Sequence, residues 1–582
     1  MRLVGKILVI VLAVIGGFVV LGFAMTIVGA LSQRPEPLPD RMVLSVNLTG
    51  GVTEIAPSDP FARLAGHHLP VLSQLVQALD RASRDSRVAA LVVRLDAAPF
   101  GMATAQELRE AVANFRQSGK RAVVFSEDMG GFGGSSVAVY LASAFQEVWL
   151  QPSGEVGLVG FIAQSPFLKG TFDMLGIEPQ FGARYEYKSA IETFTHDRFS
   201  KEARESLDAL VGAWTNQAAE GIAKSRNIPV ETVRALIDKG PLLAEDAKAA
   251  RLVDKLGYWD ELQSTLLVGG ARMVGLDEYA QHLAAQPEAV NVALIVGAGE
   301  VHSGGNDDSA RDETDFAAGR VTQAFRDAVK DPSVKAILFR IDSPGGSYTA
   351  SDAVWREVSN ARAAGKPVIV SMGDLAASGG YCAAMAADWI VADPGTITGS
   401  IGVFGGKFVI ADLWKKLGVS WDEVHRGDNA GMWSANAEFT KSGWDKLNAM
   451  LDHVYDDFTT KAEKARKLDA KAMDAVARGR VWAGDRAKEV GLIDETGGYP
   501  EAFAAVRRLA RLPSQMPLRL VAFPRQLSTL EQVRAIIRRG DLTAEAEAAL
   551  TMEARMAAML RPFAALMSDG DKTLLMPPIE TR

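Results

Sequence analysis

The chain has 582 residues, of which 48% are hydrophobic and 23% are charged, and its net charge at pH 7 is -8. This length exceeds one domain of about 100–200 residues, so two or more folded units are expected, and the acidic balance argues against a nucleic-acid partner. The single cysteine, Cys382, excludes an intrachain disulfide, and the seven histidines show no metal-ligand spacing, so neither a metal nor a cofactor is expected.

An uninterrupted apolar run opens the chain. Residues 7–31 carry no charged side chain, and Arg2 and Lys6 precede them. As a helix, at about 1.5 Å per residue, this run reaches roughly 37 Å, enough to cross a ~30 Å hydrocarbon core. We predict a cytoplasmic N-terminus over 1–6, a transmembrane anchor over 7–31 and a Pro-rich linker over 32–40, with the rest exported. A long cleaved signal sequence is the alternative.

The remainder of the chain contains an internal repeat. VAALVVRLD at 88–96 reappears as VKAILFRID at 334–342, and Gly119-Lys120 reappears as Gly365-Lys366. Later, LVD at 252–254 reappears as LID at 492–494. Because the matches keep their order along the chain, they indicate a duplicated unit.

Each copy alternates short apolar runs with helix-like stretches. LVVRL and AILFRI are apolar apart from one arginine each, as is typical of strands covered on both faces. Strands that alternate with helices predict βαβ units around a mainly parallel sheet. We therefore predict an α/β chain of two tandem, similar domains, over 41–285 and 286–515, followed by a helical C-terminal extension over 516–582.

Two glycine-rich turns follow predicted strands of the second copy. In RIDSPGGS (340–347), Gly345 and Gly346 allow a sharp turn whose N–H groups face outward, where a developing oxyanion could accept hydrogen bonds. In LAASGGYCAA (375–384), Ser378 lies where a strand ends and a helix begins, so free N–H groups gather beside its hydroxyl. A serine in this place also serves as a helix cap, and the position alone allows both interpretations.

The candidate base for Ser378 lies in the first copy, at Lys188 of YEYKSAIETF (185–194). A lysine acts as a base only when its pKa falls from about 10.4 towards about 7–8, which requires burial away from carboxylates. Glu186 and Glu192 must then point elsewhere. The first copy lacks the Ala-Ser-Gly-Gly signature, and the second has no lysine between 417 and 440. This complementary loss fits one site shared by both copies.

Together and in this order, YKSAIETF, SPGGS, MGDLAASGGYCAA and TGSIGVFGG resemble the long form of the bacterial signal peptide peptidase A family (protease IV, peptidase family S49). The resemblance covers nearly the whole chain and implies two Clp-protease/crotonase-like domains behind one anchor. The family often has asparagine where this chain has Asp342. The site residues that the resemblance implies are Ser378 as nucleophile, Lys188 as general base, Ser400 as the residue that orients the lysine, and Gly345, Gly346 and Gly379 as the oxyanion hole.

The resemblance also implies a function. It predicts a membrane-bound serine endopeptidase that hydrolyses short hydrophobic peptides such as cleaved signal peptides, without a cofactor. It further predicts a homotetramer in the bacterial inner membrane, with its catalytic domains on the periplasmic side. A crotonase-like acyl-thioester enzyme and a non-catalytic membrane scaffold are the alternatives, although the first gives Ser378 and Lys188 no joint task. The sequence leaves open whether the two residues meet within one chain or between neighbouring chains.

Overall fold

A computed structural model describes residues 37–55, 69–131, 133–283, 286–304 and 316–525, with the backbone of two short strands at 574–575 and 580–581. The predicted cytoplasmic end, the anchor over 7–31 and the linker up to residue 36 lie outside the described residues. Within the described part, no helix is both long enough and apolar enough to cross a membrane.

The first half is built around a parallel sheet of six strands, in the order β10-β1-β2-β3-β4-β9. Its central strands are apolar and buried, as in VAALVVR of β2, because helices cover the sheet. The strands are β1 (Met42–Asn47), β2 (Val88–Arg94), β3 (Arg121–Ser126), β4 (Glu147–Leu150), β9 (Lys255–Leu256) and β10 (Arg272–Gly275). The helices of this half are α3 (Leu72–Arg84), α4 (Met102–Gln117), α5 (Ser136–Ala142), α6 (Lys169–Leu175), α7 (Glu192–Thr195), α8 (Lys201–Arg226), α9 (Val230–Ile237), α10 (Ala244–Ala249), α11 (Trp259–Leu266) and α12 (Leu276–Gln281).

The second half repeats this arrangement. Its parallel strands run in the order β22-β11-β14-β16-β17-β21, and β18 adds to the end of β16. The strands are β11 (Val290–Ala298), β14 (Val334–Ser343), β16 (Val368–Ala377), β17 (Trp389–Ala392), β18 (Ile397–Gly399), β20 (Val481–Ala483), β21 (Glu495–Thr496) and β22 (Leu518–Phe523). The helices are α13 (Ala318–Lys330), α14 (Tyr348–Ala363), α15 (Gly379–Ala384), α16 (Ala411–Lys416), α17 (Lys441–Arg466), α18 (Ala470–Val476), α19 (Gly484–Glu489) and α20 (Tyr499–Leu509). The prediction of a duplicated α/β fold with parallel sheets is confirmed.

One part of the predicted architecture is wrong. Residues 518–523 were expected in a helical extension, but they form β22, which pairs in parallel with β11. The sequence LRLVAF is apolar apart from Arg519, and the edge of β11 would otherwise expose unpaired backbone groups. The second sheet therefore continues past residue 515.

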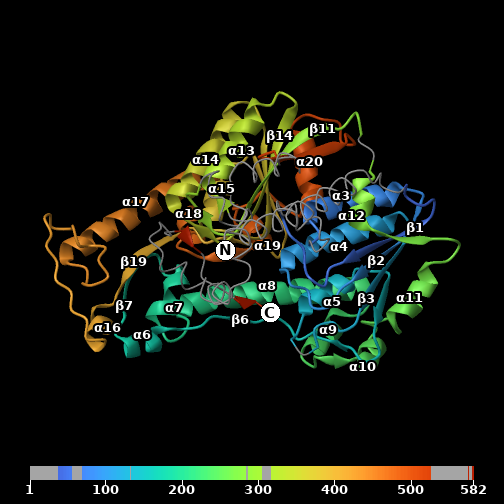
Figure 1. Cartoon of the computed structure of the whole chain (residues 1–582), viewed down its shortest axis with the longest axis horizontal. Helices are drawn as coiled ribbons and strands as arrows, with labels where there is room; N and C mark the ends of the chain where they lie inside the picture. Colours follow the sequence, from blue (N-terminus) through green and yellow to red (C-terminus); the bar gives the residue numbers. More distant parts are fainter. Residues whose placement is uncertain are drawn as a thin grey trace, which may run out of the picture.

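The two halves share one core. Leu338, Ile369 and Val391, on one face of the second sheet, belong to the same buried cluster as Leu91 and Val124 of the first half. The opposite face packs with its own helices in a separate cluster. Helix α8 of the first half, drawn in green below the second half in Figure 1, also reaches across. The indole N–H of Trp214 in α8 donates to Gly395 O at 2.8 Å.

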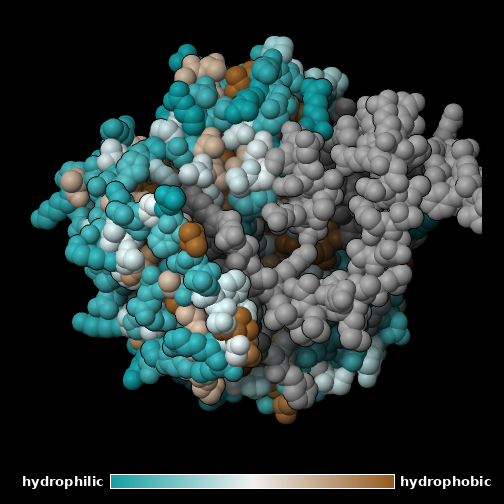
Figure 2. All heavy atoms as spheres, turned by 60° about the vertical axis from the view of Figure 1, so that its left-hand side comes forward, coloured by the Kyte–Doolittle hydropathy of each residue, from teal (hydrophilic) through white to brown (hydrophobic). Residues whose placement is uncertain are grey.

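A two-stranded antiparallel sheet joins the halves at the left of Figure 1. Strand β7 (Glu178–Arg184) belongs to the first half and β19 (Val403–Val409) to the second, and Arg184 is paired with Val403. The segment that follows β7 therefore enters the second half. On the face drawn in Figure 2 the described surface is mainly hydrophilic, with hydrophobic residues in small groups.

Candidate active site

Ser378 lies in the turn between β16 and α15 and is fully buried. Its backbone has φ 55° and ψ -113°, a conformation that L-residues rarely adopt and that costs about 1–3 kcal/mol. Its N–H donates to Gly399 O at 2.8 Å, which holds the turn against β18. The hydroxyl makes no capping bond to α15, so the interpretation of Ser378 as a helix cap is not supported.

The two glycines after Ser378 are required by close packing against the turn at 343–346. A Cβ on Gly379 would lie 2.5 Å from Ser351 Oγ, and one on Gly380 would lie 2.9 Å from Ser343 O. The small residues therefore bring α15 against the turn that follows β14. Cys382 in α15 is buried, and burial raises its pKa, which favours the unreactive thiol.

Lys188 follows β7 and extends into the second half, with only 2% of its surface exposed. Its Nζ lies 2.8 Å from Ser378 Oγ, 3.0 Å from Ser400 Oγ and 3.3 Å from Ser400 O. These contacts are hydrogen bonds that an ammonium donates, and a neutral amine would accept the one from Ser378. All three residues belong to one chain, so the pair forms without a neighbouring subunit.

The carboxylates next to Lys188 in the sequence are engaged elsewhere. Glu186 forms two 2.8 Å bonds with Arg478, and Glu192 accepts from Ser200 N and Oγ. Burial lowers the pKa of Lys188 well below its ordinary value. The lysine therefore has the environment that a general base needs.

Arg478, Gly479 and Arg480 form a supporting segment that the sequence analysis missed. Arg478 O accepts hydrogen bonds from the N–H groups of Tyr185 and Tyr187, and Arg480 O accepts from Ser400 N at 2.8 Å. At Gly479, with φ 90°, a Cβ would lie 2.5–2.6 Å from backbone and Cβ atoms of Lys188. A glycine between two arginines in the second copy was the available signal, but only the fold shows that it faces Lys188.

The predicted oxyanion-hole residues surround the Ser378 turn. Gly345 and Gly346 form β15 (Gly345–Gly346), with φ 101° and φ 151°. The N–H of Gly345 already donates to Ser343 Oγ at 3.2 Å, which favours Gly346 as the donor to an oxyanion. The nitrogen of Gly346 would lie 3.1 Å from a Cβ placed on Gly379, and Gly379 opens α15, where N–H groups lack helical partners.

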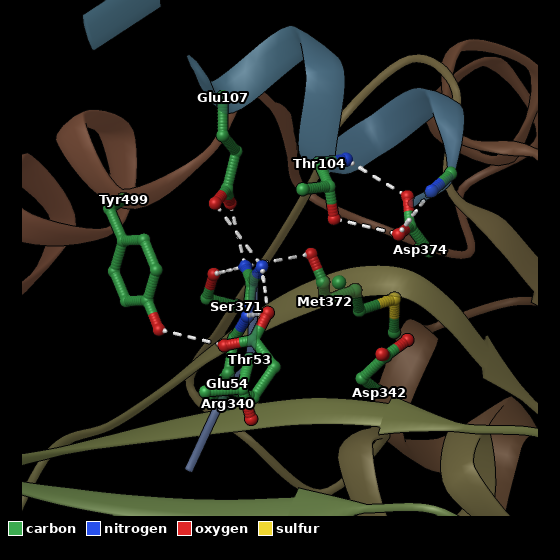
Figure 3. Close-up of polar contacts among 12 residues, drawn as sticks. Thr53, Glu54, Thr104, Glu107, Arg340, Asp342, Ser371, Met372, Asp374 and Tyr499 are labelled. Carbon is green, nitrogen blue, oxygen red and sulfur yellow. Dashed lines mark hydrogen bonds and ion pairs between the residues drawn. The ribbon is translucent and has the colours of Figure 1, made fainter. Parts of the chain in front are cut away.

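A buried ionic cluster also joins the two halves (Figure 3). Arg340 of β14, which is fully buried, donates to Glu107 of α4 at 2.6 Å and to Glu54 at 2.7 Å. It also donates to Ser371 Oγ at 2.8 Å, and Tyr499 donates to Glu54. Burial acts to lower the pKa of Arg340, but the charges of Glu107 and Glu54 outweigh it and raise that pKa.

Asp374 adds a second link between the halves. Four residues before Ser378, it accepts hydrogen bonds from Gly101 N at 2.9 Å and from Thr104 N and Oγ1 at 2.9 and 2.7 Å. Gly101 is the N-cap position of α4 and has no side chain of its own to bond there. The strand that leads to the nucleophile therefore caps a helix of the first half.

Asp342 lies between this cluster and the oxyanion turn, and its Oδ1 accepts from Leu375 N at 2.9 Å. Burial, together with the charges of Asp374 and Glu54 and against that of Arg340, raises the pKa of Asp342 to about 8. The Asp342 side chain is then neutral at pH 7, as an asparagine at this position would be. Asparagine can keep the bond to Leu375 through its amide oxygen.

We expect Asp342→Asn to reduce the loss of stability at rising pH. A folded pKa of about 8, above the ordinary 3.8, means that the folded state holds one more proton than the unfolded state between these values. Unfolding free energy therefore falls as pH rises from about 4 to about 8. Denaturant unfolding at pH 5, 7 and 9 measures this fall in the free energy of unfolding. Between pH 5 and pH 9 the free energy of unfolding of the variant should rise by at least about 1 kcal/mol relative to that of the parent. Parallel pH curves for the two proteins would contradict this.

Comparison with known proteins bears on what this site does. The sequence matches Peptidase family S49 over residues 114–269 and 360–513, one segment in each half. It is 32% identical to "Serine protease SPPA, chloroplastic" of Arabidopsis thaliana, a match that covers 79% of this chain and 69% of that one. "Protease 4" of Haemophilus influenzae is 29% identical (87% and 86% covered), and "Protease 4" of Salmonella typhi is 32% identical (76% and 72%). A ClpP1 mutant from Listeria monocytogenes aligns with 36% of this chain at 12% identity and a TM-score of 0.23, too low to support an argument.

Proposed function

Because the chain belongs to peptidase family S49, we propose that it is a membrane-anchored serine endopeptidase with Ser378 as nucleophile and Lys188 as general base. Its substrates are short hydrophobic peptides, such as signal peptides already cleaved from their proteins. The observation that carries this proposal is the 2.8 Å contact between Lys188 Nζ and Ser378 Oγ. It joins a buried amine to a buried hydroxyl across the two halves, with the neighbouring carboxylates engaged elsewhere.

The reaction follows from this geometry. Neutral Lys188 takes the proton of Ser378 as Oγ attacks the peptide carbonyl, and the oxyanion accepts hydrogen bonds from the N–H groups of Gly346 and Gly379. Lys188 then gives the proton to the leaving amine. A water molecule attacks the acyl-enzyme with Lys188 again as base, which restores Ser378 and releases the acid. Ser400 fixes the amine through its 3.0 Å bond.

Membrane attachment and assembly are further parts of the proposal. The apolar run 7–31, preceded by Arg2 and Lys6, is the anchor in a bacterial inner membrane, and both halves lie on the periplasmic side. If alkaline carbonate extracted the chain from membranes, the assignment of residues 7–31 as a membrane anchor would be overturned. The resemblance to long-form relatives supports a homotetramer, and a monomer in sedimentation of the detergent-solubilised chain would overturn it.

The test uses the full chain in detergent and a fluorogenic apolar peptide. A slowly deacylating activated ester of the same peptide should add one acyl group, mapped by mass spectrometry to Ser378. Ser378→Ala should lose the label and lower hydrolysis at least about 10³-fold, because the nucleophile is gone. Ser359→Ala, a serine on α14 away from the site, should keep both. Undiminished hydrolysis in Ser378→Ala would overturn the proposal.

A further inference from the structure

The folded part of the chain begins a short distance after the proposed membrane anchor. Pro37, the first described residue, lies six residues after the end of the apolar run 7–31. A stretch of this length spans at most roughly 20 Å even when fully extended. Arg41 follows Pro37 by four residues and immediately precedes β1. The surface around Arg41 is therefore tethered within reach of the bilayer that holds the anchor.

An exposed apolar turn lies beside Arg41. Leu267 and Val268 follow α11, and 38% and 54% of their surfaces are exposed. A Cβ placed on the next residue, Gly269, would lie 3.8 Å from Arg41 Nε. The turn leads into β10, where the N–H of Arg272 donates to Arg41 O at 3.1 Å. The side chains of Arg41, Leu267, Val268 and Arg272 therefore form one surface, which we call the entry patch.

The entry patch carries positive charge that nearby carboxylates leave uncompensated. Both of its arginines are exposed, and within the described part of the chain neither forms an ion pair. The acidic side chains on neighbouring turns are engaged with other arginines: Asp85 pairs with Arg87 at 2.7 Å, and Glu147 pairs with Arg121 at 2.7 Å. The bond from Asp85 raises the pKa of Arg87, and the charge of Asp40 adds to this rise. Two guanidinium groups of the patch thus remain available to an external anion.

This combination of groups fits a lipid headgroup region. Exposed apolar side chains enter the boundary between headgroups and acyl chains, while nearby cations bind anionic lipid. Arginine suits the phosphate of a headgroup because its planar fork donates two parallel hydrogen bonds. The chain as a whole has a net charge of -8, so an anionic membrane repels most of its surface and favours a locally basic face.

Another exposed apolar group lies at the opposite end of the molecule. Trp421 and Val424, which are 60% and 98% exposed, belong to the loop between α16 and α17. These two helices are at the left of Figure 1, whereas α11 is at the right. The loop therefore provides a control position on the same chain, remote from the entry patch.

We infer that the entry patch binds the anionic headgroups of the bilayer that holds the anchor. Leu267 and Val268 enter the headgroup region, and Arg41 and Arg272 bind lipid phosphates. This inference rests on the proposed function, because the anchor is part of that proposal. The contact fixes how the first half is oriented on the membrane.

The test places a fluorophore on the patch of the full-length chain. Val268→Cys is labelled through its thiol, since the native Cys382 is buried and unreactive. The chain is reconstituted into vesicles of phosphatidylcholine, alone or mixed with phosphatidylglycerol, with some lipids carrying a nitroxide quencher on the headgroup. After flotation with the vesicles, the label at 268 should lose most of its fluorescence in anionic vesicles and little in neutral ones. A label at Val424→Cys should lose little in either.

Charge reversal tests the role of the arginines. Arg41→Glu with Arg272→Glu should abolish the quenching at 268 in anionic vesicles, because the patch then repels the headgroups. Hydrolysis of a soluble apolar peptide should stay at the parent rate, which shows that the variant is folded. Arg426→Glu with Lys446→Glu, a matched pair of exposed residues near the opposite end, should leave the quenching at 268 unchanged.

Three outcomes would contradict the inference. Equal quenching at 268 in neutral and anionic vesicles, or quenching that survives the reversal of Arg41 and Arg272, would overturn the entry patch as a site for anionic lipid. Either result would leave hydrolysis and the acylation of Ser378 as they are, so it is distinct from a failure of the proposed peptidase. A chain that does not float with the vesicles would overturn the anchor and this inference together.

Discussion

Lys188→Met is expected to lower kcat for an apolar peptide by at least about 10³-fold, as loss of a general base does. Methionine is apolar and similar in length, so it fills the buried path between β7 and Ser378 without an amine at its end. Ser378 then has no group to take its proton, since the partner of its hydroxyl at 2.8 Å is Lys188 Nζ. Steady-state kinetics on the full chain in detergent measures the effect.

The same variant should be at least as stable as the parent at neutral pH. Burial lowers the pKa of Lys188 in the folded chain, so the folded state binds fewer protons there than the unfolded state. The free energy of unfolding of the parent therefore falls as the pH falls below the ordinary lysine pKa of about 10.4, because the unfolded chain takes up a proton on Lys188 that the folded chain does not. Methionine carries no such penalty, which separates loss of catalysis from loss of folding.

Two controls complete this prediction. Lys441→Met, at an exposed position that pairs with Asp445, should keep kcat and show no change in the pH profile. In the parent, activity should rise with pH at a value below the ordinary lysine pKa, because the neutral amine is the active form. A parent profile that rises only near pH 10, or an active Lys188→Met, would exclude Lys188 as the base.

The repeat and the strand positions could be predicted from sequence because they depend on local patterns. VAALVVRLD and VKAILFRID are both apolar runs between helix-like stretches, and they form the equivalent strands β2 and β14. The proximity of Lys188 to Ser378 could also be predicted from the sequence, since the first copy lacks the Ala-Ser-Gly-Gly signature and the second copy lacks the lysine. Because the serine motif is present only in the second copy and the lysine only in the first, the sequence predicts that the two residues lie close together.

Other features depend on contacts between distant residues that leave little local trace. The glycine at 479 is needed because Lys188, almost three hundred residues earlier, packs against it. The segment 518–523 forms a strand because it pairs with β11, which lies more than two hundred residues earlier in the sequence. The antiparallel pairing of Leu574–Leu575 with Gly345–Gly346 likewise joins segments that lie far apart in the sequence.

The sequence did not predict the buried ionic cluster around Arg340, although Arg340 lies within the repeated segment VKAILFRID. Arg94 and Arg340 occupy the same position in the two copies, at the end of β2 and within β14. Arg94 pairs with Glu127 at the surface, where both side chains are partly exposed. Arg340 is fully buried between Glu54 and Glu107. Equivalent sequence positions therefore differ in environment. Arg340 lies on the face of the second sheet that packs against the first half, whereas Arg94 lies over the ring of Trp259 in α11 at 5.4 Å, with its side chain partly exposed.

Arg340→Met is expected to lower the free energy of unfolding by about 3–5 kcal/mol, because it leaves two buried carboxylates without their partner. It also removes the bond to Ser371 of β16, the strand that ends at Ser378. Peptide hydrolysis should fall with it, since the cluster holds the halves that contribute Lys188 and Ser378. Denaturant unfolding and steady-state kinetics on the same preparations measure both effects.

Arg94→Met provides the matched control at the equivalent position of the other repeat. An exposed ion pair contributes only about 0–1 kcal/mol, so this variant should unfold close to the parent and keep its activity. Adding Glu54→Gln and Glu107→Gln to Arg340→Met should restore part of the lost stability, because neutral amides remove the uncompensated charges. Equal destabilisation by Arg94→Met and Arg340→Met would show that burial between the halves gives Arg340 no special role. If Arg340→Met unfolded like the parent yet lost hydrolysis, the cluster would instead act on the geometry of the β16 turn alone.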